Sequence, residues 1–520
     1  MNERRRRGAF GWRQFGLGFA LTLFALVLHG FAEGNRLPAL RALNEAAFDQ
    51  LQLAKPRQID PSVPVAVVDI DVESLAALGQ WPWPRTELAE LVRRLTELGA
   101  LSIAFDVVFA EPDRTSPARV IETWRKYDPE AEALGVRTLQ DHDAAFAAAI
   151  ARAPVVLGVI MNNDEGGGRP PQRAGISHSG SDPRPVIPNF VSANVNLPIL
   201  SVAASGVGNF SLGGERAAVI RRVPLLTRID EQIVPTLSIE AIRAGFQAGS
   251  ILVKSTDGSG EFGGDGIATM RVGPMEIPVE WDGGLYVYYS GPMTEREERV
   301  VSAAEIMAGD AVDPALAERI QGHVIFIGAS APGLLDLVAT PFESAAAGVN
   351  VHAELAEQII ARYFQDDRKA YRDELAAALP AATAEERPAV EAKIAELEQA
   401  MEAFSEPTFV SRPNWTIALE RAFILLVGLL VSALMAYNRV ALGAGSAVVA
   451  LASVAAAFWF SFDLYGFLLS PVYPALGVVL PWGSLTVYNY AKTDAEKRAV
   501  KNQFAHFMSP EVIEEIADDP

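Results

Sequence analysis

The stretch PVAVVDI at residues 64–70 decides the fold of the largest part of the chain. It is a continuous apolar run rich in valine, which is typical of a strand buried on both faces of a sheet. A helix is predicted downstream at 84–98, with Pro84 in its first turn and Gly99 as its stop. The run LSIAFDVVF at 101–109 then predicts a second buried strand.

The same alternation continues along the chain. An alanine-rich helix is expected at 143–152 and a third buried strand, VVLGVI, at 155–160. Strands that alternate with helices and are apolar on both faces predict an exported α/β domain with a mixed, largely parallel sheet and helices on both faces. Further strands are predicted at 220–226, 232–236, 270–277, 285–289 and 323–327, and further helices at 237–244 and 351–363.

Four apolar segments surround this domain, one before it and three after it. Each is close to the ~20 residues that a membrane-spanning helix needs. We therefore predict four transmembrane α-helices, at residues 15–33, 415–437, 440–462 and 467–490. Residues 34–412 form the exported domain, and residues 1–14 and 491–520 are the terminal segments.

Positive charges flank these segments and predict their orientation. The arginines at 4–7 and the basic residues at 492–501 place both termini in the cytoplasm, with 34–412 outside the cell inner (plasma) membrane. A cleaved signal peptide is the alternative for the first segment. His29, Glu33 and their bulky neighbours make a poor cleavage site, which favours an uncleaved anchor.

Composition limits the chemistry of the chain. Its net charge of -20 argues against a nucleic-acid partner, which requires a basic face. The lack of cysteine excludes disulfides, zinc–thiolate sites and thiol nucleophiles. The 6 histidines are scattered without ligand spacing, so we expect no metal site in this chain.

Residues 366–404 differ in character from the rest of the exported domain. They are rich in charge, Thr383 with Glu386 fits a capping box, and apolar residues from Ile394 to Phe404 recur at spacings of three and four. We predict a helical hairpin that leads to the second membrane segment. It either packs on its own domain as a solvated hairpin or serves as a dimer contact or signal-transmitting arm.

Three acidic residues are candidates for ligand binding. Asp69 and Asp71 flank Ile70 at the end of the first strand, so both carboxylates project from one face, and Asp106 lies similarly in the next strand. Ligands of α/β domains bind at the carboxyl ends of parallel strands, which favours a site here. The alternative is structural: Asp71 can cap a helix beginning near Glu73, and Asp106 can accept hydrogen bonds from loop amides.

Two further motifs are better explained as structure than as sites. GASAPGLLD at 328–336 lacks the lysine and the spacing of a phosphate-binding loop and predicts a tight turn. Nothing in the sequence places a general base such as His352 beside Ser330. Trp81 and Trp83 are expected to pack under the neighbouring helix.

Five motifs of the exported domain follow one another in a definite order. They are VAVVDIDVESLAALGQWPWPR (65–85), IAFDVVFAEPD (103–113), VIRRVPLLTR (219–228), HVIFIGASAPGLLD (323–336) and AAGVNVHAELAEQII (346–360). This succession resembles the type-two CHASE sensor, an extracellular domain associated with cyclases and histidine kinases. The resemblance covers most of residues 35–364 and leaves 366–404 as an insertion. It implies one anchor before the sensor and three spans after it, as hydropathy predicts.

The last block, residues 497–520, resembles the segment that opens the catalytic domain of class III adenylate or guanylate cyclases. Val500, Phe504 and Phe507 line one face of its predicted helix. Because such a cyclase site is completed by two chains, we expect this face to be the seam of a parallel homodimer. None of the family's catalytic positions lies in this sequence, so no catalytic residue is assigned, and magnesium or manganese is expected only for the cyclase domain that would follow.

These resemblances imply a transmembrane receptor whose exported sensor controls cyclic nucleotide synthesis, the full-length protein being a phosphorus–oxygen lyase. Its expected partners are the lipid bilayer, a second copy of the chain and an unidentified extracytoplasmic ligand. Two alternatives stay open: the sensor of a histidine or serine/threonine kinase, and a non-catalytic membrane scaffold.

Overall fold

The computed structural model has two compact units, the α/β unit (Gln52–Ser411) and the helical unit (Met1–Leu51 with Arg412–Pro520), which are described separately. The structure describes residues 11–33, 37–128, 140–212, 219–259, 266–309, 313–331, 333–334, 337–383, 385–404, 407–437 and 440–504.

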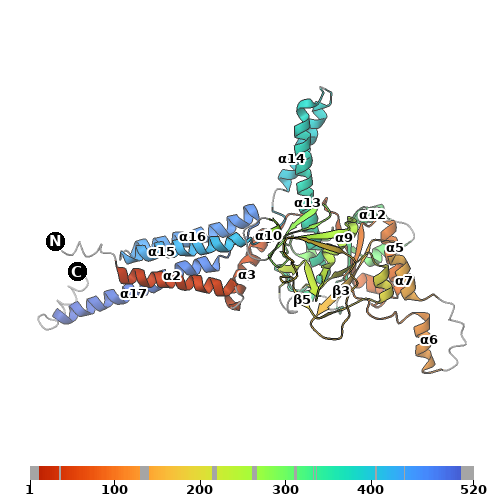
Figure 1. Ribbon diagram of the computed structural model, residues 1–520, viewed down its shortest axis with the longest axis horizontal. Helices are drawn as coiled ribbons and strands as arrows, with labels where there is room; N and C mark the ends of the chain where they lie inside the picture. Colours follow the sequence, from red (N-terminus) through yellow and green to blue (C-terminus); the bar gives the residue numbers. More distant parts are fainter. Residues whose placement is uncertain are drawn as a thin grey trace. The chain divides into compact units, whose positions relative to one another are not determined.

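A seven-stranded sheet lies at the centre of the α/β unit (Figure 1). Its strands are β1 (Val65–Ile70), β2 (Ser102–Phe105), β3 (Val155–Asn162), β6 (Ser192–Asn194), β7 (Gly206–Asn209), β15 (Val300–Ser302) and β16 (Val324–Ala329). They run in the order β15–β1–β16–β2–β3–β6, and β7 also pairs with β3. Every pair is parallel except β3 with β6.

Three of the predicted buried strands are confirmed, as β1, β3 and β16. The strand predicted at 101–109 is shorter than expected, because β2 ends at Phe105. The chain then leaves the sheet, and the Phe109 N–H donates to the Asn196 side chain over 2.7 Å. The Phe109 ring packs edge-on against Phe105 and Phe146. This part of the run is apolar because it is buried, not because it is a strand.

Helices cover both faces of the sheet, as predicted. Along β1, Ala66, Val68 and Ile70 join the core under one layer of helices, whereas Val65 and Val67 join the core under the other. The first layer comprises α4 (Val72–Leu78), α5 (Arg85–Glu97), α7 (His142–Ile150), α8 (Pro198–Ala203), α11 (Ala303–Met307) and α12 (Pro314–Ile320), and the second comprises α9 (Leu237–Gly245) and α13 (Gly348–Ala378). The short helices α6 (Pro117–Arg125) and α10 (Thr256–Ser259) lie in connecting segments.

Smaller sheets make the α/β unit mixed rather than largely parallel, which corrects the expectation from sequence. They contain β10–β9–β5, β13–β12–β11–β4, β14–β8 and β17–β18, most of whose pairs are antiparallel. Their bounds are β4 (Gly175–Ser179), β5 (Asn189–Phe190), β8 (Arg222–Pro224), β9 (Leu226–Ile229), β10 (Gln232–Pro235), β11 (Ser250–Ser255), β12 (Ile267–Val272), β13 (Met275–Pro278), β14 (Gly284–Tyr286), β17 (Leu337–Val338) and β18 (Ala346–Ala347). The single strand predicted at 270–277 is a hairpin, because Gly273 turns the chain with φ 56.

The charged segment forms the predicted helical hairpin, built by the second half of α13 and by α14 (Arg387–Ala403) (Figure 1). The helices expected separately at 351–363 and after 366 are one continuous helix of 31 residues. The capping box is present: the Thr383 N–H donates to the Glu386 carboxylate over 3.1 Å, and the Glu386 N–H donates to the Thr383 hydroxyl over 3.3 Å. Leu397 of the apolar stripe is buried.

The helical unit contains α2 (Trp12–Glu33), most of α3 (Pro38–Ala54), α15 (Asn414–Ala436), α16 (Val440–Tyr465) and α17 (Val472–Phe504). Among the described residues, three helices rather than the four predicted are long and apolar enough to cross a membrane: Trp12–Phe31, Trp415–Ala436 and Gly443–Tyr465. The segment predicted at 467–490 is helical only from Val472, and the polar and aromatic side chains of α17 lower its hydropathy.

The helices α15 and α17 both run antiparallel to α2. Against α15, contacts pair His29 with Glu420, Thr22 with Gly428, and Gly11 with Ala436. Against α17, contacts pair His29 with Tyr473, Gly18 with Leu485, and Gln14 with Asn489. Residues 473–489 of α17 therefore lie beside residues 14–29 of α2 over nearly its whole length.

Candidate functional site

Two of the three predicted site acids lie at the carboxyl edge of the central sheet. Asp69 is in register with Gly328 of β16, and Asp106 directly follows Phe105, which pairs with Ile327 of the same strand. The two acids therefore lie at one level on either side of β16, roughly 10 Å apart at the usual strand spacing. The edge is where parallel α/β sheets bind ligands.

Asp69 holds the turn that follows β16. Its carboxylate accepts hydrogen bonds from the backbone N–H of Ser330 (2.9 Å) and from the Ser330 hydroxyl. Burial raises the pKa of the Asp69 carboxyl, although the two Ser330 bonds oppose the shift, and the nearby charge of Asp71 adds to it. The Ser330 N–H therefore donates its hydrogen bond to Asp69 within the protein, in agreement with the tight turn predicted there.

Asp71 caps a helix, as the structural alternative proposed. Its carboxylate accepts from the backbone N–H of Ser74 (2.7 Å) at the start of α4. It also accepts from the Ser302 hydroxyl (3.0 Å) at the junction of β15 and α11. Asp71 therefore joins two helix starts to the sheet edge.

Asp106 is the most buried of the three acids, with 8% of its surface exposed. Its backbone N–H donates to the Ile327 carbonyl (2.8 Å), which extends the sheet by one bond. No group of three or more histidine, aspartate or glutamate side chains in the described part of the chain is placed to hold a metal ion. Ligand binding by Asp69, Asp71 and Asp106 stays a prediction.

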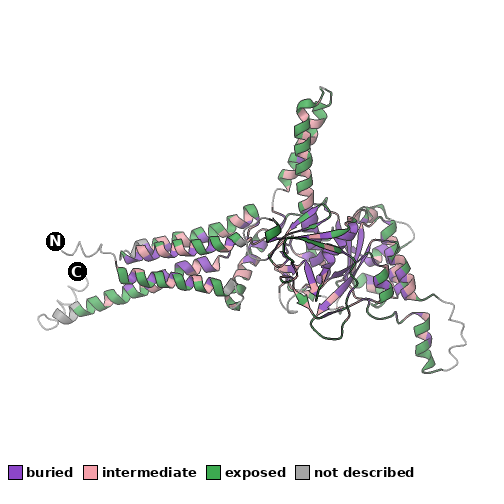
Figure 2. Cartoon of the chain, in the orientation of Figure 1, coloured by how far each residue is buried: buried purple, intermediate pink, exposed green. Residues whose placement is uncertain are grey.

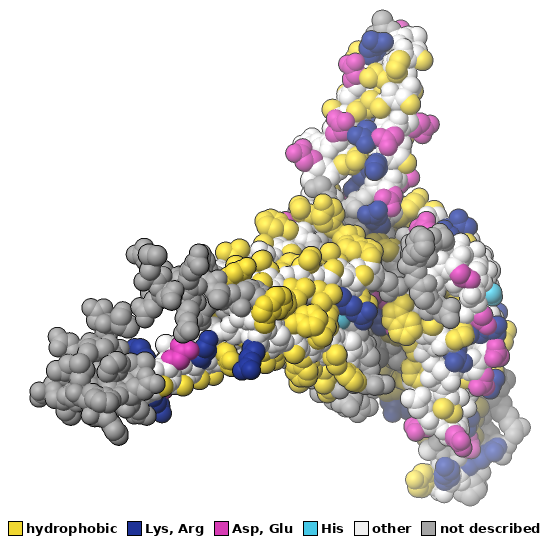
Figure 3. All heavy atoms as spheres, turned by 60° about the vertical axis from the view of Figure 1, so that its left-hand side comes forward, with side chains coloured by type: hydrophobic (Ala, Val, Ile, Leu, Met, Phe, Trp, Pro, Cys, Tyr) yellow, Lys and Arg dark blue, Asp and Glu magenta, His cyan; other side chains and the backbone are white. Residues whose placement is uncertain are grey.

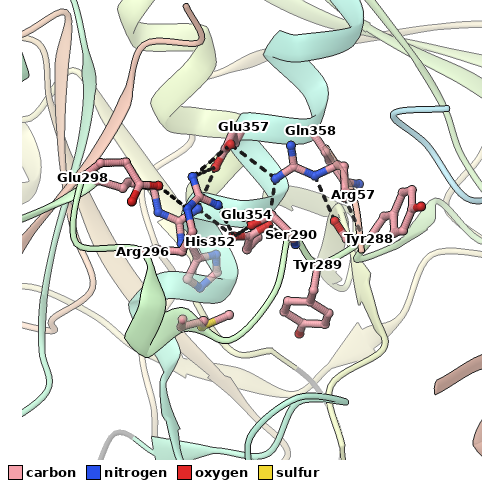
Figure 4. A network of polar contacts seen from close by, with 12 residues as sticks. Arg57, Tyr288, Tyr289, Ser290, Arg296, Glu298, His352, Glu354, Glu357 and Gln358 are labelled. Atoms are coloured by element: carbon pink, nitrogen blue, oxygen red, sulfur yellow. Dashed lines mark hydrogen bonds and ion pairs between the residues drawn. The ribbon is translucent and has the colours of Figure 1, made fainter. Parts of the chain in front are cut away.

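A larger polar site lies inside the α/β unit, and sequence reasoning missed it (Figure 4). Two carboxylates of α13, Glu354 and Glu357, face three guanidinium groups, those of Arg57, Arg296 and Arg299. All five side chains are almost completely buried. We call these five residues the buried ion network.

The contacts within the buried ion network are short and shared. Arg299 Nη1 lies 2.8 Å from Glu354 Oε1 and 2.7 Å from Glu357 Oε2. Arg57 Nη2 donates to Glu354 Oε2 over 2.8 Å, and Arg296 Nη2 donates to both oxygens of Glu357 over 3.2 Å. Burial alone would raise the pKa of both carboxyls, but the three guanidinium charges outweigh it and hold each pKa below its ordinary value.

Further hydrogen bonds extend the buried ion network to the start of the α/β unit. Gln52 accepts from the Tyr289 N–H over 3.0 Å, and Arg57 Nε donates to the Tyr288 carbonyl over 3.0 Å. From α13, the Gln358 side chain accepts from the Tyr288 N–H and donates to the Tyr286 carbonyl. The segment 286–290 thus joins the first residues of the unit to its long helix.

One sequence signal could have pointed to this network. Glu354 and Glu357 stand three residues apart in a helix whose other residues from 349 to 361 are largely apolar. Two charges on a buried helix require partners, because an unpaired buried charge is costly. The sequence could not have named those partners, since Arg57 and Arg299 are about 240 residues apart.

His352 also lies on α13, but away from Ser330. Its Nδ1 lies 3.0 Å from the Ser238 hydroxyl and its Nε2 lies 3.2 Å from the Phe210 carbonyl. Burial lowers the pKa of His352 to about 4. The imidazole is therefore neutral, and both of its nitrogens are occupied by structural contacts.

The tryptophan motif packs inside the protein, as predicted. Trp83 is buried, and its ring meets that of Trp81 edge-on at 5.3 Å. The Trp83 indole N–H donates to the Gly79 carbonyl over 2.9 Å. The guanidinium of Arg85 lies over the Phe109 ring at 4.4 Å.

The predicted dimer seam falls at the limit of the described chain. Positions 500 and 504 belong to α17, but the side chains of Val500 and Phe504 are outside what the structure describes, as is the whole of Phe507. The seam stays a prediction.

Comparison with known families gives one result. The model of the CHASE2 domain matches residues 20–384, which is well over half of the chain. Comparisons with curated proteins and with solved structures give no match.

Proposed function

We propose, because the chain belongs to the CHASE2 domain family, that it is the sensor and membrane part of a receptor that controls cyclic nucleotide synthesis by an adenylate or guanylate cyclase. CHASE2 is an extracellular sensor domain of signalling proteins. The observation that carries the proposal is the family match, flanked by helices that are long and apolar enough to cross a membrane. The cyclase output rests on the resemblance of residues 497–520.

The geometry of the helical unit supports four membrane crossings. Although α17 is too polar to qualify by hydropathy, it lies beside α2 from Tyr473 to Asn489. A helix that accompanies a spanning helix over nearly its whole length crosses the same layer, with its polar groups turned toward its neighbours. With α16 connecting α15 to α17 in the chain, four crossings would agree with the basic flanks, which predict both termini on one side.

The buried ion network supports a rigid link from the start of the sensor to α13. Arg57 follows the segment that leaves the first membrane helix, and α13 continues into the hairpin that precedes the second. A ligand that favours one position of α13 relative to Arg57 would shift the receptor between two states. We place the ligand at the carboxyl edge of the central sheet, near Asp69, Asp71 and Asp106.

Alkaline phosphatase fusions test the topology. A fusion at Ser255 is expected to be active and a fusion at Lys501 inactive, because the enzyme is active only outside the cytoplasm. The reverse pattern would contradict the orientation on which the receptor proposal rests.

Single cysteine substitutions test the expected dimer, and they are easy to interpret because the chain contains no cysteine. Oxidative crosslinking in membranes should be strong at positions 500, 504 and 507 and weak at 498, 502 and 505. Uniform or absent crosslinking would remove the seam that aligns two output domains.

An in-frame fusion tests the output. A class III catalytic domain attached after Pro520 should produce cyclic nucleotide, and Arg299→Gln in the sensor should change its rate. Residues 1–520 alone should make no cyclic nucleotide from ATP or GTP with magnesium or manganese, and measurable turnover would contradict our interpretation of residues 497–520.

A further inference from the structure

The carboxylate of Glu420 is the centre of a polar cluster in the helical unit. Glu420 lies near the start of α15 and is almost completely buried. One of its oxygens, Oε2, lies 2.9 Å from His29 Nε2 and 3.0 Å from Arg412 Nη2. The other, Oε1, accepts the backbone N–H of Ser470 over 2.8 Å. We call Glu420, His29, Arg412 and Ser470 the Glu420 cluster.

The members of the Glu420 cluster come from three different segments of the chain. His29 belongs to α2, Arg412 precedes α15, and Ser470 lies in the connection between α16 and α17. The imidazole is fully buried, its edge meets the Tyr473 ring at 5.0 Å, and its Nδ1 lies 3.4 Å from Arg421 Nε. The cluster therefore ties the ends of α2, α15 and α17 together at one level.

Two further contacts between these helices carry no charge. Thr22 of α2 packs against Gly428 of α15, where an added Cβ would lie 2.5 Å from the threonine side chain. At the other end of the helices, the Gln14 side-chain amide donates to Oδ1 of the Asn489 side chain over 2.7 Å. Small residues and neutral hydrogen bonds of this kind hold membrane helices together. The Glu420 cluster differs because its carboxylate needs a compensating charge.

Arg412 supplies that charge from the segment that leaves the α/β unit. Val410 lies two residues before Arg412, and Phe409 lies three residues before it. Both are buried, and Phe409 belongs to the larger core of the α/β unit. Three positions along the chain therefore separate a core residue of the α/β unit from Arg412. Without Arg412, the buried carboxylate would keep only the imidazole and one amide, and removing one partner of a buried ion pair is strongly unfavourable.

We propose that the Glu420 cluster is a latch through which movement of the segment leaving the sensor is passed to α2 and α17. The latch holds one arrangement of the three helices while Arg412 is in place. When the sensor withdraws Arg412, that arrangement loses its compensating charge and a second one becomes favoured. This inference rests on the proposed receptor function and adds the residue at which the signal passes to the membrane helices.

Crosslinking at the far end of α2 tests the latch. The substitutions Gln14→Cys and Asn489→Cys are made together in the full chain, and their reaction with a short bismaleimide is timed in membranes. Arg412→Gln or Glu420→Gln should change the rate at least threefold. Arg412→Lys keeps the charge and should stay close to the parent rate. Asp463→Asn removes a carboxylate from α16 instead of from the cluster and is the matched control.

Thermal unfolding in detergent separates the latch from a purely structural role. An unchanged crosslinking rate in Arg412→Gln and Glu420→Gln overturns the proposal, whether or not the melting temperature falls. If Glu420→Gln does not fold, the comparison of Arg412→Gln with Arg412→Lys decides, since Arg412 is partly exposed. The fusions at Ser255 and Lys501 test the receptor topology separately, so a failed latch and a failed receptor are distinguishable.

Discussion

The α/β unit and the helical unit differ in how many of their large apolar side chains are exposed (Figures 2 and 3). In the α/β unit, large apolar residues such as Phe105 and Phe326 are fully buried. In the helical unit, Leu426 and Val448 are 70% and 67% exposed, whereas Thr22 is fully buried. Figure 3 shows the exposed hydrophobic side chains gathered over the helical unit.

The difference follows from the solvent that each unit is built for. In water, removing apolar surface drives folding. Lipid tails are as apolar as leucine, so membrane helices gain nothing by hiding leucine and pack through small and polar residues instead. Both units nevertheless bury charge. In the α/β unit, Arg57 pairs with Glu354 from 297 positions away, whereas in the helical unit Arg412 pairs with Glu420 from 8 positions away. The predictions below test whether these contacts are equally important.

The largest effect is expected from breaking the buried ion network. Glu354→Ala leaves three buried guanidinium groups facing one carboxylate, and such a loss typically costs about 3–5 kcal/mol. Chemical unfolding of the full chain in detergent measures it. The matched control is Glu298→Ala, because Glu298 also pairs with Arg296 but is 57% exposed and should change stability by less than about 1 kcal/mol. Equal effects would show that burial does not set the strength of these pairs.

A second effect depends on pH and on His352. The folded protein keeps this imidazole neutral down to pH about 4, whereas the unfolded chain takes up a proton below its ordinary value of 6.5. Stability should therefore fall as the pH drops from 6.5 to about 4, by about 1.4 kcal/mol per unit, and the loss should level off below that range. In His352→Gln this part of the pH dependence should disappear. If the two unfolding profiles stay parallel, the imidazole does not titrate as described.

A third, smaller effect is expected in the helical unit. Gly428→Ala places a methyl group against Thr22 and should destabilise the packing of α2 on α15 by about 1–3 kcal/mol. Gly445→Ala is the control, because an added Cβ there meets nothing within 4 Å. Its effect should be neutral or slightly stabilising, since alanine favours helix. Thermal melting in detergent compares the two, and equal melting temperatures would argue against close packing of α2 and α15.

The smallest effects are expected at the sheet edge. Asp71→Ala removes the cap of α4 and should cost about 1 kcal/mol. If Asp106 is purely structural, Asp106→Asn should lower stability by about 1–3 kcal/mol through a lost buried hydrogen bond. If it contacts ligand, signalling of the cyclase fusion should change while unfolding does not. The two readouts together decide which role Asp106 has.

The sequence predicts the periodic parts of this fold well and its long-range pairs poorly. The strand β1 and the helix α5 follow directly from apolar runs and from Pro84 and Gly99. The end of β2 at Phe105 could not be predicted from the sequence. The residues after it remain apolar up to Phe109, which is buried in the core without being part of a strand. Hydropathy predicts one span at 467–490, whereas the helix begins only at Val472 and its Asn489 pairs with Gln14 of α2.

The candidate sites divide in the same way. Asp69 and Asp71 are visible because acids at strand ends have a known place in α/β sheets. The partners of Glu354 and Glu420 could not be predicted from the sequence, because tertiary contacts bring them together. Arg57 lies 297 positions from Glu354, and His29 lies 391 positions from Glu420.

The long helix α13 extends from the core of the α/β unit into the helical hairpin. Its residues up to Ala361 are held in the core, and residues 362–378 continue in the same helix into the hairpin. Arg368 pairs with Asp60 over 2.7 Å, so the arm that extends beyond Arg368 is ~15 Å long at the usual rise per residue. A 5° tilt of the buried half moves the tip of this arm by ~1 Å. A spectroscopic label at the hairpin tip would therefore report a tilt of α13 around Glu354 as a change in a measured distance.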